Sequence, residues 1–223
     1  MDLQAIRAYG VSAFVILAAC GLASPAPAQR LVRENQLIST TLPSLRIEVA
    51  PAFRFVGTVP FRIGSVAEGE RFIFVDARDT VVERMVIAQF EAILPASDQR
   101  YNYSFQDAQL VAGYRFRTNA FAFSNAAALA EHPEGEAALT AAFLRGRGYV
   151  LEDELMAFRY LTVPDSARRH ELIIFYVEAL PRHGVRLTDL YVNDRETPRW
   201  QELAKDLARR ARAAFSILPL AAP

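Results

Sequence analysis

The chain has 223 residues, which is enough for one sizeable domain or two small ones. Hydrophobic residues make up 52% of it and charged residues 22%, a balance typical of a folded globular protein. Basic and acidic residues number 25 each, so the chain has no net charge that would attract nucleic acid. We therefore expect no nucleic-acid partner.

The first 28 residues have the pattern of an export signal. A weakly positive start that includes Arg7 leads into an apolar run over residues 11–23. This run is shorter than the roughly 20 residues that a membrane-spanning helix needs. The sequence Ala26-Pro27-Ala28 fits a signal-peptidase site. Cleavage after Ala28 would release a mature chain without cysteine into the periplasm, and this is the route that we expect.

A second processing route stays open at Cys20, the single cysteine of the chain. Leu17-Ala18-Ala19-Cys20 resembles the bacterial lipobox, in which the cysteine becomes acylated. Under this alternative the signal covers residues 1–19, and the protein is a lipoprotein held at the membrane only through the lipid on Cys20. Both routes place the domain in the bacterial cell envelope. Without disulfide bonds, its stability must come from packing.

The alternation of residue types over residues 70–94 predicts the central element of the fold. Segments rich in β-branched and aromatic residues alternate with period two, which is typical of half-buried strands. The short polar break at residues 78–80 predicts that the two segments pair as an antiparallel hairpin. In the first segment, one face carries Phe72 and Phe74, and the other carries Arg71, Ile73 and Val75.

Alternating segments elsewhere predict the remaining strands. They lie at residues 45–49, 53–59, 101–105, 114–118, 155–163, 171–180 and 185–192. We interpret residues 29–44 as a lead-in segment and residues 45–218 as a single domain. Residues 219–223 are expected to form a frayed tail.

The stretch between the strands at residues 114–118 and 155–163 predicts helical structure. Ser124 or Asn125 is a suitable N-cap for a helix over residues 126–130. His132-Pro133 interrupts the helical pattern, which resumes over residues 134–145 and ends at the following glycines.

A second helical region is expected near the C-terminus. Thr197 followed by Pro198 matches an N-cap and a first helical position. Apolar residues then recur at steps of three and four from Trp200 to Leu218, which predicts an amphipathic helix.

Together these elements predict an α+β domain. An antiparallel sheet of about nine strands would carry a central helical region, with the C-terminal amphipathic helix packed on it. The alternative is an up-and-down β-barrel with the terminal helix packed outside.

Aromatic residues at period-two positions are the feature that stands out most. They are Phe53, Phe55, Phe72, Phe74, Tyr101, Tyr103, Phe105, Tyr114, Phe116, Phe121 and Phe123. Rings of this kind form either a core beneath the helices or a pocket for an apolar ligand. The residues that we select as ligand-binding candidates are Phe72, Phe74, Tyr101, Tyr103, Tyr114 and Phe116.

Motifs of catalysis or metal binding are weak in this chain. His132, His170 and His183 are isolated, without the spacing that places two ligands on one helical face. The acidic run over residues 152–154 lacks the spacing and glycine of a calcium loop. There is no nucleophile motif and no glycine-rich phosphate loop. We therefore predict no catalytic residue, no metal and no cofactor.

These observations favour an exported cell-envelope protein that acts by binding. Two forms remain open: a carrier or sensor of an apolar small molecule, and a module that assembles with another envelope protein. The alternative is a periplasmic hydrolase that uses His170 or the carboxylates of residues 152–154.

Overall fold

Antiparallel strands form most of the structure, a computed structural model that describes residues 29–193 and 195–220. The predicted export signal with its Cys20, and residues 221–223 of the predicted tail, lie outside the described residues. The described residues form an α+β fold in which the strands divide between two open sheets and a two-stranded ribbon. No closed barrel is found in this part of the chain.

The large sheet has the order β4-β5-β6-β11-β10-β8-β7, and all of these neighbours are antiparallel. A short strand, β9, pairs in parallel with β6 off this path. The strands are β4 (Arg54–Ile63), β5 (Ala67–Arg78), β6 (Val81–Ile93), β7 (Gln109–Val111), β8 (Tyr114–Ser124), β9 (Val150–Leu151), β10 (Glu154–Thr162) and β11 (His170–Ala179).

The small sheet joins the two ends of the described chain. Its order is β1-β2-β3-β14, so the last strand pairs with the third. These strands are β1 (Arg30–Arg33), β2 (Gln36–Ser39), β3 (Leu45–Val49) and β14 (Phe215–Pro219). The ribbon consists of β12 (Tyr191–Val192) and β13 (Arg195–Glu196).

The predicted central hairpin is confirmed as β5 and β6. The turn between them has positive φ at both central residues, 48° at Asp79 and 72° at Thr80. A two-residue turn with two positive φ angles matches the twist of the strands that it joins. As alternation predicted, Phe72 and Phe74 face one side of the sheet, and Ile73 and Val75 face the other.

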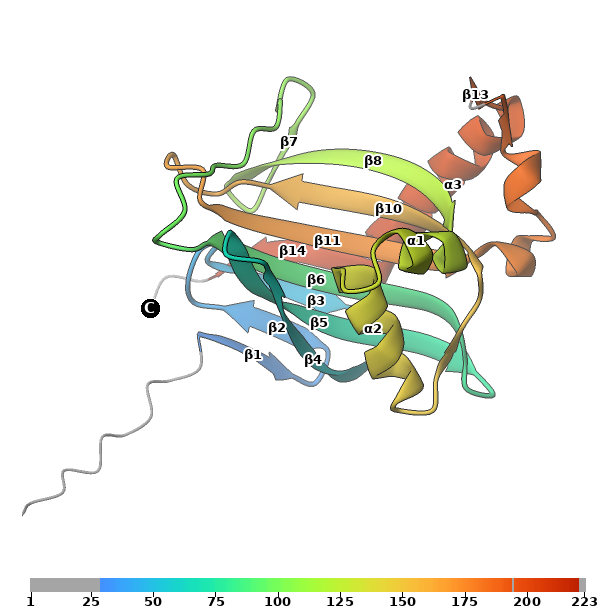
Figure 1. Ribbon diagram of the computed structural model, residues 1–223, viewed down its shortest axis with the longest axis horizontal. Coiled ribbons are helices and arrows are strands. Elements are labelled where there is room, and N and C mark those ends of the chain that lie inside the picture. Colours follow the sequence, from blue (N-terminus) through green and yellow to red (C-terminus); the bar gives the residue numbers. More distant parts are fainter. Residues whose placement is uncertain (1–28, 194, 221–223) are drawn as a thin grey trace, which may run out of the picture.

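Each face of the large sheet has its own cover (Figure 1). The small sheet and α3 (Pro198–Ala214) pack on one face, where the larger hydrophobic core lies. The two shorter helices, α1 (Asn125–Glu131) and α2 (Glu136–Arg145), lie over the other face. This second face carries the candidate site described below.

The caps predicted from sequence set the starts of α1 and α3. The Ser124 hydroxyl accepts from the backbone N–H of Ala127, and the Thr197 hydroxyl accepts from that of Trp200. Helix α2 packs against a bulge of β4 at Gly57, whose φ is +134°. A Cβ at Gly57 would lie 2.9 Å from the Phe143 ring, so glycine allows α2 to approach the sheet closely.

The C-terminal helix is shorter than its apolar stripe predicted. It ends at Ala214, and the chain then becomes extended as β14. Phe215 and Leu218 therefore belong to a strand, because β14 completes the edge of the small sheet beside β3. The pattern alone could not show this partner.

Three other expectations were wrong. Residues 29–44, expected as a lead-in, contain β1 and β2, with Leu37 fully buried in the core. The expected strand at 185–192 is mostly irregular: a 3₁₀ turn at Leu180–His183 precedes it, a second one at Leu187–Asp189 lies within it, and only Tyr191–Val192 is a strand. The expected strand at 101–105 is a loop. In the first case β2 pairs with β3. In the second, only Tyr191 and Val192 form a strand, which pairs with β13, and in the third the segment pairs with no strand among the described residues.

Candidate functional site

The structure does not bring the six predicted ligand-binding residues into one pocket. Phe72, Phe74 and Phe116 are buried in the core that faces the small sheet and α3. Tyr114 packs at the border of the same core, and its hydroxyl accepts from the Ser44 N–H at 3.0 Å. These four rings contribute to packing between the two sheets.

Tyr101 and Tyr103 lie apart from the other four, in the loop after β6. Their rings stack with centroids 6.2 Å apart. The Tyr101 hydroxyl donates to Oε1 of Glu91 at 2.6 Å, so this loop is tied to the opposite face of the large sheet. Neither tyrosine lines the cavity described below; they pack with Ala67 and Ile93 in a separate small cluster.

An apolar cavity of about 330 Å³ lies between the large sheet and the helices α1 and α2. Its volume falls at the lower end of the range of small-molecule sites. The sheet contributes its floor through Met85, Ile87, Phe121, Phe123, Leu155, Ala157, Phe175 and Val177. The helices contribute Asn125 and Ala128 from α1 and Ala137 and Thr140 from α2.

The register of the strands explains why this face is continuous. Met85 lies opposite Val177, which lies opposite Ala157, and Ala157 lies opposite Phe121. Four neighbouring strands thus place one apolar row across the cavity floor. An alanine within this row leaves space that the short helices above do not fill.

Arg71 lines one end of the cavity and is buried, with 8% of the residue exposed. Its Nε donates to Oε1 of Gln89 at 2.7 Å. Its Nη1 donates to the Glu136 carbonyl oxygen at 2.7 Å and to the Thr140 hydroxyl at 2.8 Å. Arg71 therefore fixes the first turn of α2 to strands β5 and β6.

The direct partners of Arg71 are all neutral. Among the described residues, no carboxylate lies within ion-pair distance of its guanidinium. Burial lowers the pKa of Arg71 to about 10, while Glu136 and Glu91 raise that pKa through space. The group therefore remains a cation at neutral pH. A buried charge is normally paired, so a cation without a contacting anion is unusual.

Two carboxyl groups face each other one row beyond Arg71. Glu91 on β6 lies directly opposite Glu171 on β11, and both are buried. Burial raises the pKa of Glu171 to about 7; the Tyr103 hydrogen bond opposes this shift and the Glu91 charge adds to it. Burial also raises the pKa of Glu91, against hydrogen bonds from Tyr101 and Gln89. Oε1 of Glu171 has no hydrogen-bond partner.

Sequence analysis did not select Arg71, Gln89, Glu91 or Glu171, although a signal for them exists. Each has the same parity as buried apolar residues of its strand. A charged or amide side chain at an inward position of a strand predicts a buried polar group that needs a partner. Phe121 and Phe123 are odd-numbered while Tyr114 and Phe116 are even-numbered, so a continuous β8 places them on opposite faces.

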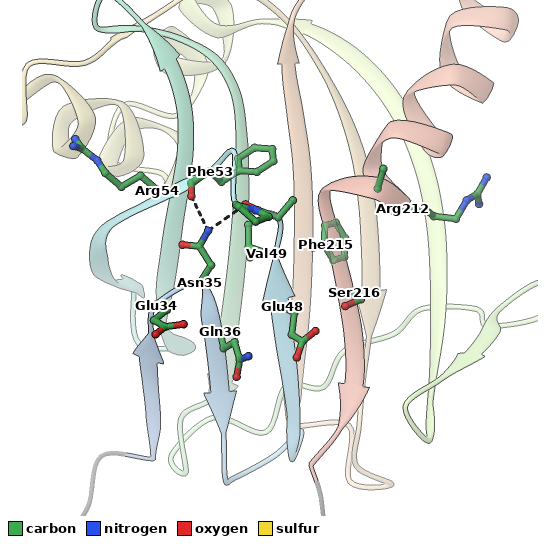
Figure 2. Close-up of a pocket in the computed structure, with 13 residues that line it drawn as sticks. Glu34, Asn35, Gln36, Glu48, Val49, Phe53, Arg54, Arg212, Phe215 and Ser216 are labelled. Atoms are coloured by element: carbon green, nitrogen blue, oxygen red, sulfur yellow. Dashed lines mark hydrogen bonds between the residues drawn. The ribbon is translucent and has the colours of Figure 1, made fainter.

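A larger hollow of about 810 Å³ lies beside the small sheet (Figure 2). Exposed side chains surround it, including Glu34, Arg54 and Arg212. The polar group at its centre already has a structural role, because Nδ2 of Asn35 donates to the carbonyl oxygens of Ala50 at 3.1 Å and Phe53 at 2.8 Å (Figure 2). These bonds hold the turn between β3 and β4, so we give this hollow no functional role.

The groups suggested for hydrolysis do not converge. Asp153 accepts from the Ala126 N–H at 2.6 Å and so caps α1, and Glu154 pairs with Arg186 at 2.8 Å. His170 lies at the other end of the hairpin of β10 and β11, about 30 Å from Glu154 along the strand. A shared catalytic centre at these residues therefore has no geometric support.

Comparisons and the remaining side-chain groups add no further assignment. Within residues 29–193 and 195–220, no three His, Cys, Asp or Glu side chains are grouped so that they could hold a metal ion. No helix in the described ranges has both the length and the apolar character needed to span a membrane. The chain matches no protein-family model, no curated protein and no solved structure, so its function must be argued from the site itself.

Proposed function

We propose that this protein is exported to the bacterial cell envelope and binds an apolar small molecule beneath α1 and α2, as a carrier or a sensor. The observation that carries this proposal is the apolar cavity on the helix-covered face of the large sheet. Ligand sites are typically concave and apolar with a few polar groups, and here those groups are Arg71, Asn125 and Thr140.

The contrast between cavity and core supports binding over simple packing. A core of this size is normally packed to the density of an organic crystal, and a void costs stability. On the other face of the same sheet, large side chains such as Phe74, Phe116 and Trp200 are almost fully buried. A cavity that persists next to a buried cation is better explained by a ligand that occupies it.

A matched pair of alanine substitutions on α1 tests the proposal. Ala128 lines the cavity, whereas Ala130 is exposed and does not. We expect Ala128→Leu to fill the space and weaken binding of the neutral fluorescent probe 1-aminoanthracene at least about tenfold. Ala130→Leu should leave binding unchanged. Fluorescence titration of wild type and both variants measures this, and equal binding by all three would contradict the proposal.

The exported location has its own test. The mass of the mature protein from a periplasmic fraction should correspond to a chain that begins at Gln29. A diacylated chain that begins at Cys20 would support the lipoprotein alternative. An uncleaved chain in the cytoplasmic fraction would contradict both routes.

A further inference from the structure

Arg71 is the feature of the cavity that an apolar ligand alone does not explain. A cavity for a purely apolar molecule would be expected to have an apolar lining throughout, because burying a charge costs free energy that such a ligand does not return. Arg71 instead places a cation at the end of a mostly apolar cavity, beside the hydroxyl of Thr140.

The contacts of Arg71 leave its charge without a counter-ion. Gln89, the Glu136 carbonyl and Thr140 satisfy its Nε and Nη1, but each of these acceptors is neutral. The acidic groups that act on it from a distance are Glu136 on α2 and Glu91 on β6. Glu91 is separated from Arg71 by Gln89, which donates to Oε2 of Glu91 at 3.0 Å. The position next to Arg71 on the cavity side is thus the place where an anion is missing.

We infer that the natural ligand is a single-chain amphiphile with a carboxylate head, whose head pairs with Arg71 and whose apolar chain fills the cavity toward Leu155. This inference rests on the proposed function, because it names the class of molecule that the same cavity binds. The Nε and Nη1 groups of Arg71 already have acceptors, whereas no hydrogen bond joins Nη2 to any of the described residues. Nη2 can therefore donate charge-assisted hydrogen bonds to a carboxylate.

The charges around Arg71 favour a head with one negative charge. Among the described residues, Arg71 is the one cation that lines the cavity, and Glu91 and Glu136 already offset part of its field. A second negative charge on the head would face these carboxylates without a further cation. The volume of the cavity agrees with a ligand that has a short apolar chain, since about 330 Å³ is small for a ligand site.

Three probes of equal chain length separate this inference from the proposed function. We expect wild-type protein to bind decanoate at least about tenfold more tightly than decan-1-ol, and decyltrimethylammonium more weakly still, because a hydrogen bond to a charged group stabilises binding by roughly one to two powers of ten. Isothermal titration calorimetry at pH 8, where decanoate is ionised, gives the three affinities without any variant.

Substitution of Arg71 gives the second arm of the experiment. Arg71→Met should weaken decanoate binding about 10- to 100-fold, and the preference for decanoate over decan-1-ol should fall to about one. Arg71→Lys keeps the charge and should retain most of the preference for decanoate. Arg209→Met, on the exposed surface of α3, is the matched control and should change neither affinity.

The outcomes of the two proposals differ. If decan-1-ol binds as tightly as decanoate, and Arg71→Met affects neither, the carboxylate inference fails while the apolar site stands. If none of the probes binds, and Ala128→Leu has no effect on 1-aminoanthracene, the proposed function fails as well. A variant that does not fold leaves the comparison of three probes on wild-type protein to decide.

Discussion

The two faces of the large sheet differ in the partners that they provide for buried charged groups. On the face that packs against the small sheet and α3, Glu178 is almost fully buried but has three donors. Arg210 Nε donates to it at 2.8 Å, His183 Nε2 lies 2.7 Å from it, and the Tyr176 hydroxyl also donates. On the face beneath α1 and α2, Glu171 has an oxygen without any partner, and Arg71 has no contacting anion.

The pKa values of the two carboxyl groups record this difference. Burial raises the pKa of both. For Glu178 the hydrogen bonds from His183, Arg210 and Tyr176 outweigh burial and lower the pKa to about 2. For Glu171 burial prevails, and the pKa rises to about 7. A satisfied carboxylate stabilises the fold, whereas an unsatisfied one costs stability and is typical of a functional site.

Removal of the Glu178 charge should have the largest effect on stability. Glu178 on β11 contacts His183 in the following 3₁₀ turn and Arg210 on α3, so it links these three elements. Glu178→Gln would leave the Arg210 guanidinium without a carboxylate partner. We expect the free energy of unfolding at pH 7 to fall by about 3–5 kcal/mol, measured by urea denaturation. Glu202→Gln, on the exposed side of α3, should change it by less than about 0.5 kcal/mol.

In the same variant, the free energy of unfolding should depend less on pH below pH 4.5 than it does in wild type. The folded pKa of Glu178 is below its unfolded value of 4.5, so its contribution is present above pH 4.5 and is lost as the pH falls toward 2. A wild type and a Glu178→Gln variant that lose stability in parallel over this range would show that Glu178 is not the group responsible.

Removal of the Glu171 charge should have the opposite sign. Its folded pKa of about 7 is above the unfolded value of 4.5, so the folded state holds the proton more tightly and wild-type stability falls as the pH rises from 4.5 to above 7. Glu171→Gln should remove this loss and be more stable than wild type at pH 8, by up to about 3 kcal/mol. At pH 4 the two proteins should be nearly equal.

Urea denaturation at both pH values provides the measurement for Glu171. A variant that is less stable than wild type at pH 8 would mean that the Glu171 carboxylate has partners like those of Glu178. The contrast between the two faces would then be lost.

A smaller effect is expected for the tyrosine beside this carboxyl pair. Tyr101→Phe removes the donor to Glu91 but keeps the ring that stacks on Tyr103. We expect a loss of about 2 kcal/mol at pH 8, because the variant removes a hydrogen bond to a buried carboxyl group. Tyr149→Phe is the control, because the Tyr149 hydroxyl is on the surface beside Arg54. An equal loss of stability in both variants would contradict a special role for Tyr101.

Local patterns predicted much of the fold but not the strand pairing of the small sheet. Period-two alternation gave the hairpin of β5 and β6, and the Ser124 and Thr197 caps gave two helix starts. The partners of β1, β2 and β14 depend on contacts between distant parts of the chain, which alternation cannot show. For the same reason, Phe215 continued a helical stripe in sequence and yet forms a strand.

The candidate site was predicted least well because its residues do not follow the usual alternation, in which inward positions of a strand carry large apolar side chains. The aromatic residues that were selected, such as Phe72 and Phe116, are those that a well-packed core requires. The cavity instead depends on a small residue, Ala157, and on a charged one, Arg71, at inward positions. Alternation records that a residue faces inward, but the space left beside it depends on how α1 and α2 cross the sheet.

A crystal structure of the protein with decanoate that carries bromine on its last carbon tests the ligand site most directly. Anomalous scattering locates bromine without reference to the rest of the density. The account predicts a bromine peak among Phe121, Leu155 and Val177, with the carboxylate next to Arg71. An empty cavity, or a bromine peak beside Arg71 with the carboxylate at the opposite end, would contradict it.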